Sequence, residues 1–567
     1  MEYFSGGNIM RLNKLLIIVG TILLVLTVLA AWAQDKSKPY LSGRPFNPDF
    51  LKYLEDAKAG NLKLTTKDGH GLGGIPQHID PDYVKDVKIQ WAKPMTSFPA
   101  KFDELREQNK LTPIRDQKNC GSCWSFATYG SLESGLYPDL SSDFSENNMK
   151  NRHGFDWSCC GGGNTFISVA YLTRWDGPMN EADDPYDDDA NNCQSPTGLT
   201  VRKHIQEVTW FPKRTGDLDN DNIKQAVSTY GAAHTSMCWV DTAYNQNTHA
   251  YYYDSTEEQG GHEVCIVGWD DNYDKNNFNT TPASNGAFIV RNSWGPAWGE
   301  NGYFYVSYYD KKFGYRNFLA IYPGVQATTN YDKVYYYDPL GFVDPIGDGQ
   351  SETAWFGNIF TSQGAEQLAA AAFFIPYPNS TFELSVYLDP TNGPINPGGA
   401  ALTQSGSLPN MGYKTIVLNT PIQLTNQQKF SVIVKLTTPG CKYQIPVEYP
   451  VANFSSKATA NAGESYTSTD GTTFTDVTTY QGYEQANVCV KAFTKTSGGQ
   501  RICGDCNNDG EVTAGDAQWA FDCYLDKHTG SDCDHAFADV NSDSDVTPGD
   551  AQAIFENYLQ GTPLNCP

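Results

Sequence analysis

The chain has 567 residues, 13% of them aromatic, and a formal charge of -25 at pH 7 from 40 basic and 65 acidic residues. This length exceeds what one hydrophobic core ordinarily serves, so about three or four domains are expected. The acidic balance argues against nucleic acid or an anionic membrane as a partner. The 14 cysteines are more than a typical cytosolic protein carries and indicate an oxidising compartment.

Residues 1–33 have the pattern of a secretory signal peptide. Residues 10–14 form a basic n-region with Arg11 and Lys14, residues 15–30 are apolar, and Ala-Trp-Ala at 31–33 matches a small-x-small cleavage site. An uncleaved membrane anchor is the alternative, because the apolar run is near the lower limit for spanning a bilayer. The protein is therefore expected to be secreted or extracellular.

Residues 34–96 form a polar N-terminal extension interrupted by proline and glycine. The pattern at 50–55 predicts a short amphipathic helix. The glycine-rich run GHGLGGIP at 69–76 predicts a loop.

Residues 97–325 contain residue types used in nucleophilic catalysis. Cys123 ends the run QKNCGSC, which begins at Gln117, and is followed by a predicted helix over 124–133. The macrodipole of such a helix lowers the pKa of a thiol at its N-terminus. His262 precedes an apolar strand, and Asn292 begins the run NSWG.

These residues resemble the signature of the papain family of cysteine peptidases, a C-G-S-C-W run with a distal His and Asn. His262 lies 139 residues beyond Cys123 (262 − 123), within the family's range of about 130–150. Asn292 lies 169 residues beyond it (292 − 123), and a polar insertion at 270–284 accounts for the excess. The resemblance implies an α+β papain-like fold over 97–325, with a helical half and a β-barrel half.

The resemblance implies a role for each of these residues. Cys123 and His262 form a thiolate–imidazolium pair, and His262 then protonates the leaving amine. Asn292 orients the imidazole ring. Gln117 and the backbone N–H of Cys123 form the oxyanion hole. Trp294, together with a second tryptophan nearby, shields the bond between the ring and Asn292 from water.

The resemblance extends to the substrate cleft. The run CCGGG at 159–163 is similar to the family's Cys-x-Gly-Gly, so Gly163, with Gly162 as the alternative, is expected to contact the substrate backbone alongside Trp294. In that family a pro-segment covers the cleft; residues 34–96 stand in its place, but they are short, and whether they are cleaved is open. The implied disulfides are Cys120–Cys160 and Cys159–Cys193.

Residues 331–495 alternate short β-type runs with turn signals, which predicts an antiparallel β-sandwich. The region resembles the lectin-like domain that follows the peptidase in some bacterial papain relatives. Exposed aromatics such as Trp355 are candidates for stacking on sugar, which makes carbohydrate one expected partner; a structural or substrate-presenting sandwich is the alternative. A disulfide between Cys441 and Cys489 is left open.

After a linker at 496–502, residues 503–567 contain a repeat with a period of 34 residues (539 − 505). Each copy places oxygen-bearing side chains at loop positions that suit a hard cation and then continues into a helix. The pattern resembles a type I dockerin module, a small all-α double EF-hand-like unit that binds two Ca²⁺ and docks onto a cohesin domain. The expected ligands are Asp505, Asn507, Asp509, Glu511 and Asp516 in the first loop, and Asp539, Asn541, Asp543, Asp545 and Asp550 in the second.

The sequence therefore predicts a secreted cysteine endopeptidase that hydrolyses a protein or peptide substrate without a catalytic cofactor. The dockerin-like module would attach it to a cohesin-bearing scaffold or surface. Two alternatives remain: a non-catalytic adhesive or scaffold-associated binding protein, and a dockerin-bearing component of a polysaccharide-degrading complex. Peptide specificity is not readable from the sequence.

Overall fold

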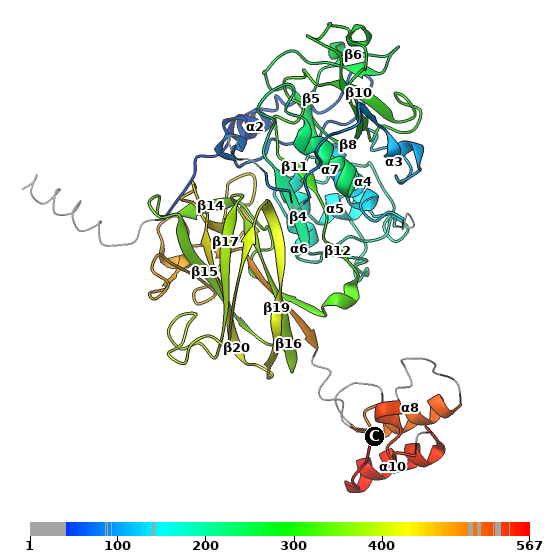
Figure 1. Cartoon of the computed structure of the whole chain (residues 1–567), viewed down its shortest axis with the longest axis vertical. Coiled ribbons are helices and arrows are strands. Elements are labelled where there is room, and N and C mark those ends of the chain that lie inside the picture. Colours follow the sequence, from blue (N-terminus) through cyan, green and yellow to red (C-terminus); the bar gives the residue numbers. More distant parts are fainter. Residues whose placement is uncertain are drawn as a thin grey trace, which may run out of the picture.

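The computed structural model describes residues 41–84, 87, 89–91, 93–138, 142–496, 503–506, 512–525, 527, 535–543 and 545–566. The predicted signal peptide and residues 497–502 of the predicted linker lie outside this part. Figure 1 shows a mixed helix-and-strand region above a β-sandwich, with a pair of helices apart from both at the C-terminal end. No helix among the described residues has the length and apolarity needed to cross a bilayer.

The helical half of the first region is built around α4 (Cys123–Ser134), and every residue of α4 is buried. Its neighbour α6 (Thr165–Thr173) begins at Asn164, whose side chain accepts hydrogen bonds from two backbone N–H groups of the first turn. Capping of this kind satisfies donors that a helix start would otherwise leave unpaired. The predicted helix over 124–133 is confirmed. The other helices here are α3 (Glu104–Glu107), α5 (Glu146–Arg152) and α7 (Asp221–Tyr230).

The β half carries the long strand β8 (Gly260–Asp270), which is buried along nearly its whole length. It lies between β5 (Ala233–Trp239) and β9 (Ala287–Arg291), and both pairings are antiparallel. The predicted insertion after residue 269 lies between β8 and β9, where the chain forms the short 3-10 helix η4 (Lys275–Asn277). The sheet continues through β10 (Tyr303–Ser307), β7 (Ala250–Tyr251) and β6 (Tyr244–Asn245), and β2 (Lys101–Phe102) pairs with β8.

The sandwich has a six-stranded sheet in the order β18-β17-β20-β15-β22-β23. Alternate residues of β17 and β20 face a core of buried aliphatic and phenylalanine side chains, as the period-2 pattern of a half-buried strand requires. Cys441 and Cys489 are both buried free thiols, so the disulfide left open for them is not formed. The strands are β15 (Thr353–Thr361), β17 (Ser380–Leu388), β18 (Leu402–Leu408), β20 (Lys429–Thr437), β22 (Ser465–Ser468) and β23 (Thr475–Asp476).

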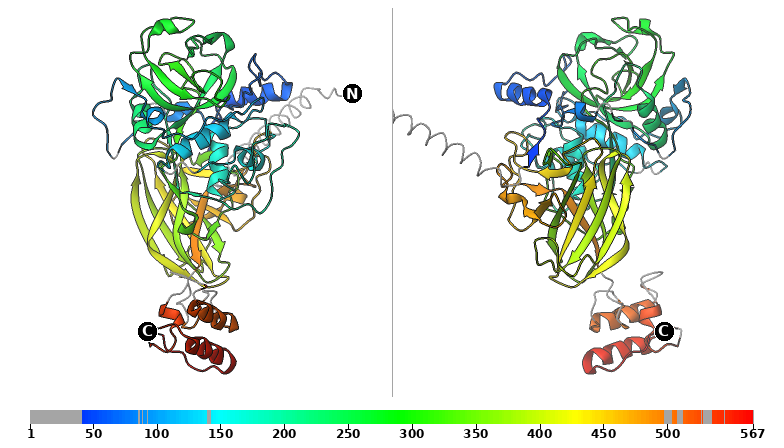
Figure 2. Two further views of the ribbon diagram at one scale, coloured as in Figure 1. Left: turned by 90° about the vertical axis from the view of Figure 1, so that its right-hand side faces the viewer. Right: turned by 60° about the vertical axis from the view of Figure 1, so that its left-hand side comes forward.

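The second layer of the sandwich is continuous with the sheet of the first region. Strand β19 (Met411–Leu424) pairs with β16 (Glu366–Ile375) on one side and with β4 (Glu207–Phe211) on the other. Backbone hydrogen bonds therefore join the two domains, and Figure 2 shows them stacked in direct contact. The chain crosses between them through β11 (Leu319–Ile321), β12 (Val325–Gln326), which pairs with β3 (His204–Ile205), and β13 (Lys333–Tyr335), which pairs with β25 (Val490–Thr496).

Residues 41–84 run along both domains, and we call them the N-terminal strap. The strap contains β1 (Ser42–Gly43), the helix α2 (Pro48–Ala59) and the 3-10 helix η2 (Pro81–Val84). The amphipathic helix predicted at 50–55 is thus present and longer. Strand β1 forms one edge of a four-stranded sheet with β14 (Asp344–Gly347), β21 (Ile445–Glu448) and β24 (Asn487–Val488) of the sandwich.

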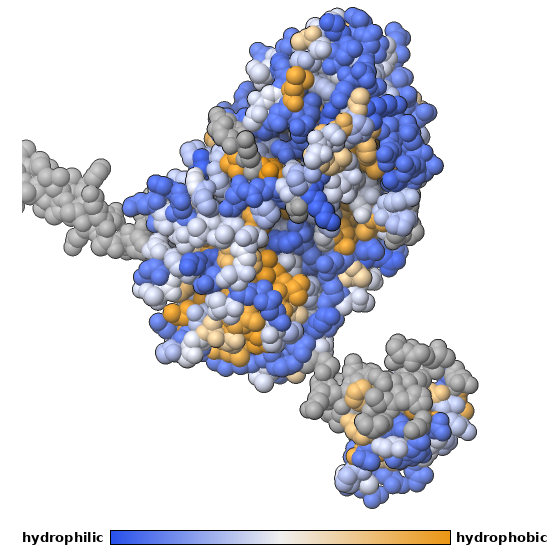
Figure 3. All heavy atoms as spheres, viewed as in Figure 1, coloured by the Kyte–Doolittle hydropathy of each residue, from blue (hydrophilic) through white to orange (hydrophobic). Residues whose placement is uncertain are grey.

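The surface differs between the two large domains. In Figure 3 hydrophilic side chains predominate over the upper domain, whereas an apolar patch lies over the sandwich. Among the exposed apolar side chains of the sandwich is Val417, in β19.

The described residues of the C-terminal part include the helices α8 (Ala514–Tyr524) and α10 (Pro548–Gln560), which pack against each other, and the short α9 (His535–Ala538) before the second. Thr513 and Asp516 form a capping box at the start of α8, and Thr547 and Asp550 form the same box at α10. A disulfide joins Cys503 to Cys566 and ties the ends of this part together. The sequence repeat therefore corresponds to a structural repeat.

Candidate active site

Cys123 is the first residue of α4 and is fully buried. The backbone N–H of Glu263, in β8, donates a hydrogen bond of 3.4 Å to its sulfur. The nucleophile candidate therefore lies where the helical half meets the β half. Cys123, at the start of the helix, and His262, on β8, are far apart in sequence, but the fold brings both to this boundary between the two halves.

His262 is held by the residue expected to orient it. Its Nε2 lies 2.7 Å from Asn292 Oδ1, which also accepts the backbone N–H of Ser293 at 2.8 Å. Because that oxygen accepts from a backbone N–H, the amide orientation is fixed and His262 Nε2 must be the donor. The opposite ring nitrogen, Nδ1, is buried without a hydrogen-bond partner. The imidazole thus keeps one lone pair available for a proton.

Tryptophans enclose this histidine. The Trp294 ring stacks on His262 with centroids 4.6 Å apart, and Trp298 meets Trp294 edge-on at 4.9 Å. Trp239 of β5 packs against Trp294 at 4.6 Å. Water is excluded from the His262–Asn292 bond by this arrangement. Trp239 was not singled out from the sequence, because a lone tryptophan in a β-type run is indistinguishable from ordinary core.

Gln117 is fully buried beside the nucleophile. Its side-chain carbonyl accepts the Ser293 hydroxyl at 2.6 Å, which aims the amide nitrogen toward the cleft. That nitrogen donates to Cys120 O at 2.8 Å and to Gly71 O at 3.1 Å. Gln117 is therefore placed to donate to a carbonyl oxygen lying over Cys123.

One of the two carbonyls that Gln117 binds, Gly71 O, belongs to the strap, whose middle part lies in the cleft. Gly163 N–H donates to Gly73 O at 2.9 Å, and Ile75 N–H donates to Gly163 O at 3.0 Å. On the opposite wall Gly74 N–H donates to Gly261 O at 2.9 Å. The glycine-rich run predicted as a loop thus takes the place expected for a substrate backbone.

The remaining residues expected to bind substrate also contact the strap. A Cβ added at Gly162 would lie 2.8 Å from Gly73 O, so the two backbones are in close contact there. His70 of the strap stacks on the face of Trp294 with centroids 4.9 Å apart. Gly162, Gly163 and Trp294 are therefore brought together around one extended segment.

Two charged residues that the sequence analysis did not identify also line the cleft. Arg316 is buried, donates to Gly74 O at 2.9 Å, and pairs with Glu258 at 2.9 Å. Glu263 is buried beside His262 and binds His234 at 2.9 Å and Asn317 at 3.1 Å. No local sequence pattern identifies Arg316. It lies at the cleft because β11, the strand that comes directly after it in the chain, joins the sheet.

The pKa values of Cys123 and His262 differ from those expected when the thiol lies at a helix N-terminus. Burial raises the pKa of the Cys123 thiol to about 12, with the Glu263 carboxylate adding to the rise. Burial likewise lowers the pKa of His262 to about 4, against the opposing hydrogen bond to Asn292. Desolvation disfavours the charged form of either group and here outweighs the helix dipole. Both shifts favour the neutral form of each group in this covered state, whereas the sequence predicts a thiolate–imidazolium pair.

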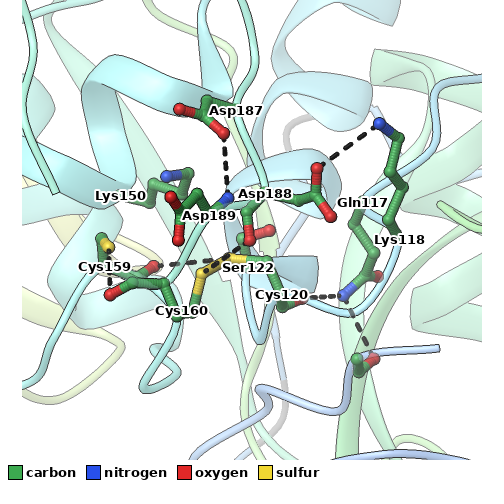
Figure 4. The surroundings of a disulfide bond; sticks show 12 residues. Gln117, Lys118, Cys120, Ser122, Lys150, Cys159, Cys160, Asp187, Asp188 and Asp189 are labelled. Atoms are coloured by element: carbon green, nitrogen blue, oxygen red, sulfur yellow. Dashed lines mark hydrogen bonds and ion pairs between the residues drawn. A yellow bond between two sulfur atoms is a disulfide. The ribbon is translucent and has the colours of Figure 1, made fainter. Parts of the chain in front are cut away.

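Disulfides support the loops that border the cleft. Figure 4 shows the bond between Cys120 and Cys160, whose sulfurs are 2.01 Å apart. Cys159 and Cys193 form the second expected bridge at 2.03 Å. Lys118 pairs with Asp188 at 3.4 Å, which links the segment before the nucleophile to the acidic loop at residues 187–189.

The predicted calcium ligands are partly within the described residues. Asn507, Asp509 and Glu511 lie outside them. In the second loop Asp543 N–H donates to Asp539 and to Asn541, and Asp545 N–H donates to Asp543. The described residues contain no group of three or more His, Cys, Asp or Glu side chains arranged around a metal position. The remaining predicted ligands, Asp505, Asp516 and Asp550, are buried carboxylates at the loop ends.

The aromatic proposed to stack on sugar is partly covered. The Lys435 ammonium lies 5.2 Å over the Trp355 ring. A Cβ added at Gly471 would lie 2.7 Å from the same indole. Trp355 is therefore only partly exposed, with Lys435 over its ring and Gly471 against its indole.

Comparisons with known proteins show which families the parts of this chain resemble. Residues 98–321 match the papain family cysteine protease model, residues 334–494 the lectin like domain and residues 503–560 the dockerin type I domain. The family model, together with the fold, thus identifies residues 98–321 as a papain-like cysteine protease domain. The chain as a whole combines this cysteine peptidase domain with a lectin-like domain and a dockerin type I domain.

Among curated proteins, a cysteine protease of Blomia tropicalis is 28% identical over 236 residues, 40% of this chain and 66% of that protein. A viral cathepsin of Bombyx mori nuclear polyhedrosis virus is 30% identical over 233 residues, 40% of this chain and 65% of that protein. The chain thus spans slightly less than two thirds of these relatives' length.

Among solved structures, the cysteine protease and lectin-like domains of Cwp84, a surface layer associated protein of Clostridium difficile, superpose with a TM-score of 0.68 at 24% identity. The match covers 81% of this chain and 98% of that chain. A structure of clostridial Cwp84 after propeptide cleavage gives a TM-score of 0.62 at 25% identity, covering 70% and 99%. The two-domain arrangement therefore has a precedent in fold.

Proposed function

We propose that this protein is a cysteine endopeptidase that hydrolyses peptide bonds with Cys123, His262 and Asn292. The observation that carries the proposal is the hydrogen bond from His262 Nε2 to Asn292 Oδ1, which leaves Nδ1 unpaired. A ring held in this tautomer is suited to accept the thiol proton. The backbone contact of Cys123 with the residue after His262 supports the same pairing.

The chemistry would proceed in two stages. Cys123 transfers its proton to His262, and the thiolate sulfur attacks the carbonyl carbon of the scissile bond. The negative charge on the carbonyl oxygen is stabilised by Gln117 and the Cys123 N–H, a contribution of about 3–4 kcal/mol per donor. The C–N bond breaks as His262 protonates the leaving amine. Water, deprotonated by His262, then hydrolyses the thioester and restores the thiol.

We further propose that the described state is a latent one. The strap backbone fills the position of a substrate, and Gln117 donates to its Gly71 carbonyl. Burial in this state also raises the pKa of the Cys123 thiol and lowers that of His262, which favours the neutral form of both groups. Displacement of the strap should therefore make room for a substrate and allow the catalytic pair, Cys123 and His262, to adopt its charged form.

The C-terminal module is proposed to bind calcium and a cohesin domain. Asp550 reaches back from position 12 of the second loop and accepts Val540 N–H at 3.0 Å, so the two ends of the loop are adjacent. Together with Asp539, Asn541 and Asp543 it forms an all-oxygen donor set of the kind that Ca²⁺ prefers. These residues, and Asp505 and Asp516 in the first loop, would hold the ions and fix the loops.

The cohesin proposal rests on the repeated helices. Each presents the same three apolar residues, which are between 37% and 59% exposed. Exposed apolar groups that recur at equivalent positions are typical of a docking face. Attachment through this face, together with the disulfides, supports an extracellular or surface location. The residues are Phe521, Tyr524 and Leu525 after the first loop, and Phe555, Tyr558 and Leu559 after the second.

The peptidase proposal is tested by substituting the nucleophile. After the chain has been cut between the strap and the peptidase domain and the strap has been removed in mild urea, Cys123→Ser should abolish hydrolysis of a fluorogenic peptide and labelling by an epoxide thiol reagent. Cys441→Ser is the matched control, because Cys441 is also a buried free thiol but lies in the sandwich. Its labelling and activity should equal those of the unsubstituted protein. Labelling that persists in Cys123→Ser would show that another thiol reacts.

A further inference from the structure

We propose that the β-sandwich has a function of its own in this chain: it anchors both ends of the strap and thereby keeps the cleft closed even after the chain is cut. The inference rests on the proposed peptidase function and goes beyond it by assigning the sandwich a regulatory role. The strap's middle lies in the cleft, whereas residues near each of its ends are bound by the sandwich. Three sets of contacts carry the argument.

The first anchor is a strand pairing. Ser42 and Gly43 pair antiparallel with Gly347 and Ile346, so the strap adds an edge strand to a sandwich sheet. Leu41, just before this strand, is buried in the sandwich core together with Ile346. Edge pairing supplies backbone hydrogen bonds, and the buried side chain adds apolar contact.

The second anchor is the buried face of α2. Phe50 has no solvent exposure, and its ring meets Phe454 of the sandwich edge-on with centroids 5.1 Å apart. His78, further along the strap, lies against the same ring at 4.8 Å. The next residue of the helix, Leu51, is 44% exposed. The helix thus inserts one aromatic side chain into the boundary between the domains while its other face remains in solvent.

The third anchor holds the C-terminal end of the strap. The Tyr83 hydroxyl donates a hydrogen bond to Pro376 O, and its ring lies 6.0 Å from that of Tyr377. Arg44 lies 4.9 Å over Tyr83 and 5.4 Å over Tyr443 of the sandwich. Arg44 therefore connects the beginning of the strap, its end and the sandwich at one place.

These anchors differ in kind from the contacts in the cleft. The cleft binds the middle of the strap mainly through its backbone, with some side-chain contacts such as those of Gln117 and Trp294. The sandwich instead packs against the side chains of a leucine, a phenylalanine and a tyrosine near the ends of the strap. Binding at several linked points makes each point effectively intramolecular with respect to the others. A cut between residues 84 and 98 removes one covalent connection and none of the anchors. The cut strap is therefore retained, and its release requires the sandwich contacts to break.

The test uses the full chain with residues 93–97 replaced by the recognition sequence of an exogenous protease. These residues are exposed and lie between the strap and the peptidase domain. Two quantities are measured before and after cutting: the fraction of the N-terminal fragment that co-elutes with the rest on gel filtration, and kcat/KM for a fluorogenic peptide. We expect the fragment to co-elute after cutting and kcat/KM to remain below about a tenth of its value after mild urea has removed the fragment.

Phe50→Ala, with Leu51→Ala as its matched control on the same helix, tests the anchor. Phe50→Ala should speed loss of the cut fragment at least about 100-fold, the effect expected for removing a buried phenylalanine. Leu51→Ala should leave release unchanged. If Phe50→Ala fails to fold, Tyr443→Leu on the sandwich takes its place, with release about two- to five-fold faster through loss of the Arg44 stacking.

The outcomes separate this inference from the proposed function. Spontaneous loss of the fragment from the cut, unsubstituted chain overturns the inference, as does equal release from Phe50→Ala and Leu51→Ala. Retention that depends on Phe50 or Tyr443 supports it. If the fragment is lost from Phe50→Ala but no peptide is hydrolysed and Cys123 is not labelled, the peptidase proposal fails while the anchoring of the strap stands.

Discussion

Replacing Gly73 by alanine should open the cleft without any change to the mature peptidase domain. Gly73 lies in the strap above Cys123, where an added Cβ would lie 2.7 Å from the Cα of Gly121 and still closer to its carbonyl. Both atoms are backbone atoms of the cleft wall and cannot rotate away. The strap must therefore lift at this point.

The magnitude follows from the hydrogen bonds that lifting breaks. Gly73 O accepts from Gly163 N–H at 2.9 Å, and the neighbouring Gly71 O accepts from Gln117 at 3.1 Å. At about 1 kcal/mol each, losing the two costs about 2 kcal/mol. This corresponds to roughly a 30-fold larger population with the strap lifted. The uncut full chain carrying Gly73→Ala should thus hydrolyse peptide roughly 30-fold faster than the unsubstituted chain.

The assay is kcat/KM of the uncut chain for a fluorogenic peptide, with epoxide labelling of Cys123 measured in parallel. Leu64→Ala is the control, because Leu64 belongs to the strap but is 44% exposed. Its activity should match that of the unsubstituted chain. If Gly73→Ala also leaves activity and labelling unchanged, although the strap-free protein is active, then the contact of Gly73 with Gly121 does not limit access to the cleft.

The remaining predictions concern pH and calcium. With the strap in place, alkylation of Cys123 should rise continuously through pH 9, because burial raises the pKa of its thiol to about 12. Removal of the strap gives water access to the site, which lowers the pKa of the Cys123 thiol and raises the pKa of His262 from about 4. A plot of kcat/KM against pH should then be bell-shaped, with a plateau at mildly acidic to neutral pH. A strap-free rate that only rises through pH 9 would contradict the ion pair. In the full chain, calorimetry should find two Ca²⁺ sites, of which Asp516→Asn and Asp550→Asn each remove one and weaken cohesin binding. Glu556→Ala, in α10 but outside the loop, should change neither the number of Ca²⁺ sites nor cohesin binding. Two unchanged sites in the double variant Asp516→Asn, Asp550→Asn would refute the ligand assignment.

The domain arrangement carries a consequence for stability. Strand β19 of the sandwich pairs with β4 of the peptidase domain, and Trp210 of β4 packs against Phe342 and Phe374. The two domains thus share a sheet and a core, so relative motion between them would break backbone hydrogen bonds. A strap fixed to the sandwich is for this reason also fixed relative to the cleft.

Several features were predictable from the sequence because they depend on local pattern. The apolar run after His262 predicts a buried strand, and β8 is one; the run after Cys123 predicts a helix, and α4 begins at that residue. The 34-residue repeat predicts two loop–helix units, and both have the same capping box. Spacing, apolar periodicity and capping chemistry act over a few residues, so one sequence is enough to recognise them.

Other features were decided only by tertiary structure. The glycine-rich run at 69–76 has the composition of any loop, and its place in the cleft depends on partners such as Gly163 and Gly261, far along the chain. The raised pKa of the Cys123 thiol arises because folding removes water from a residue whose helix position alone predicts the opposite shift. The sequence by itself determined which groups carry the chemistry. Long-range packing determined which segments cover these catalytic groups. Burial and contact between distant segments are properties of the assembled fold, and no periodic pattern in the sequence predicts them.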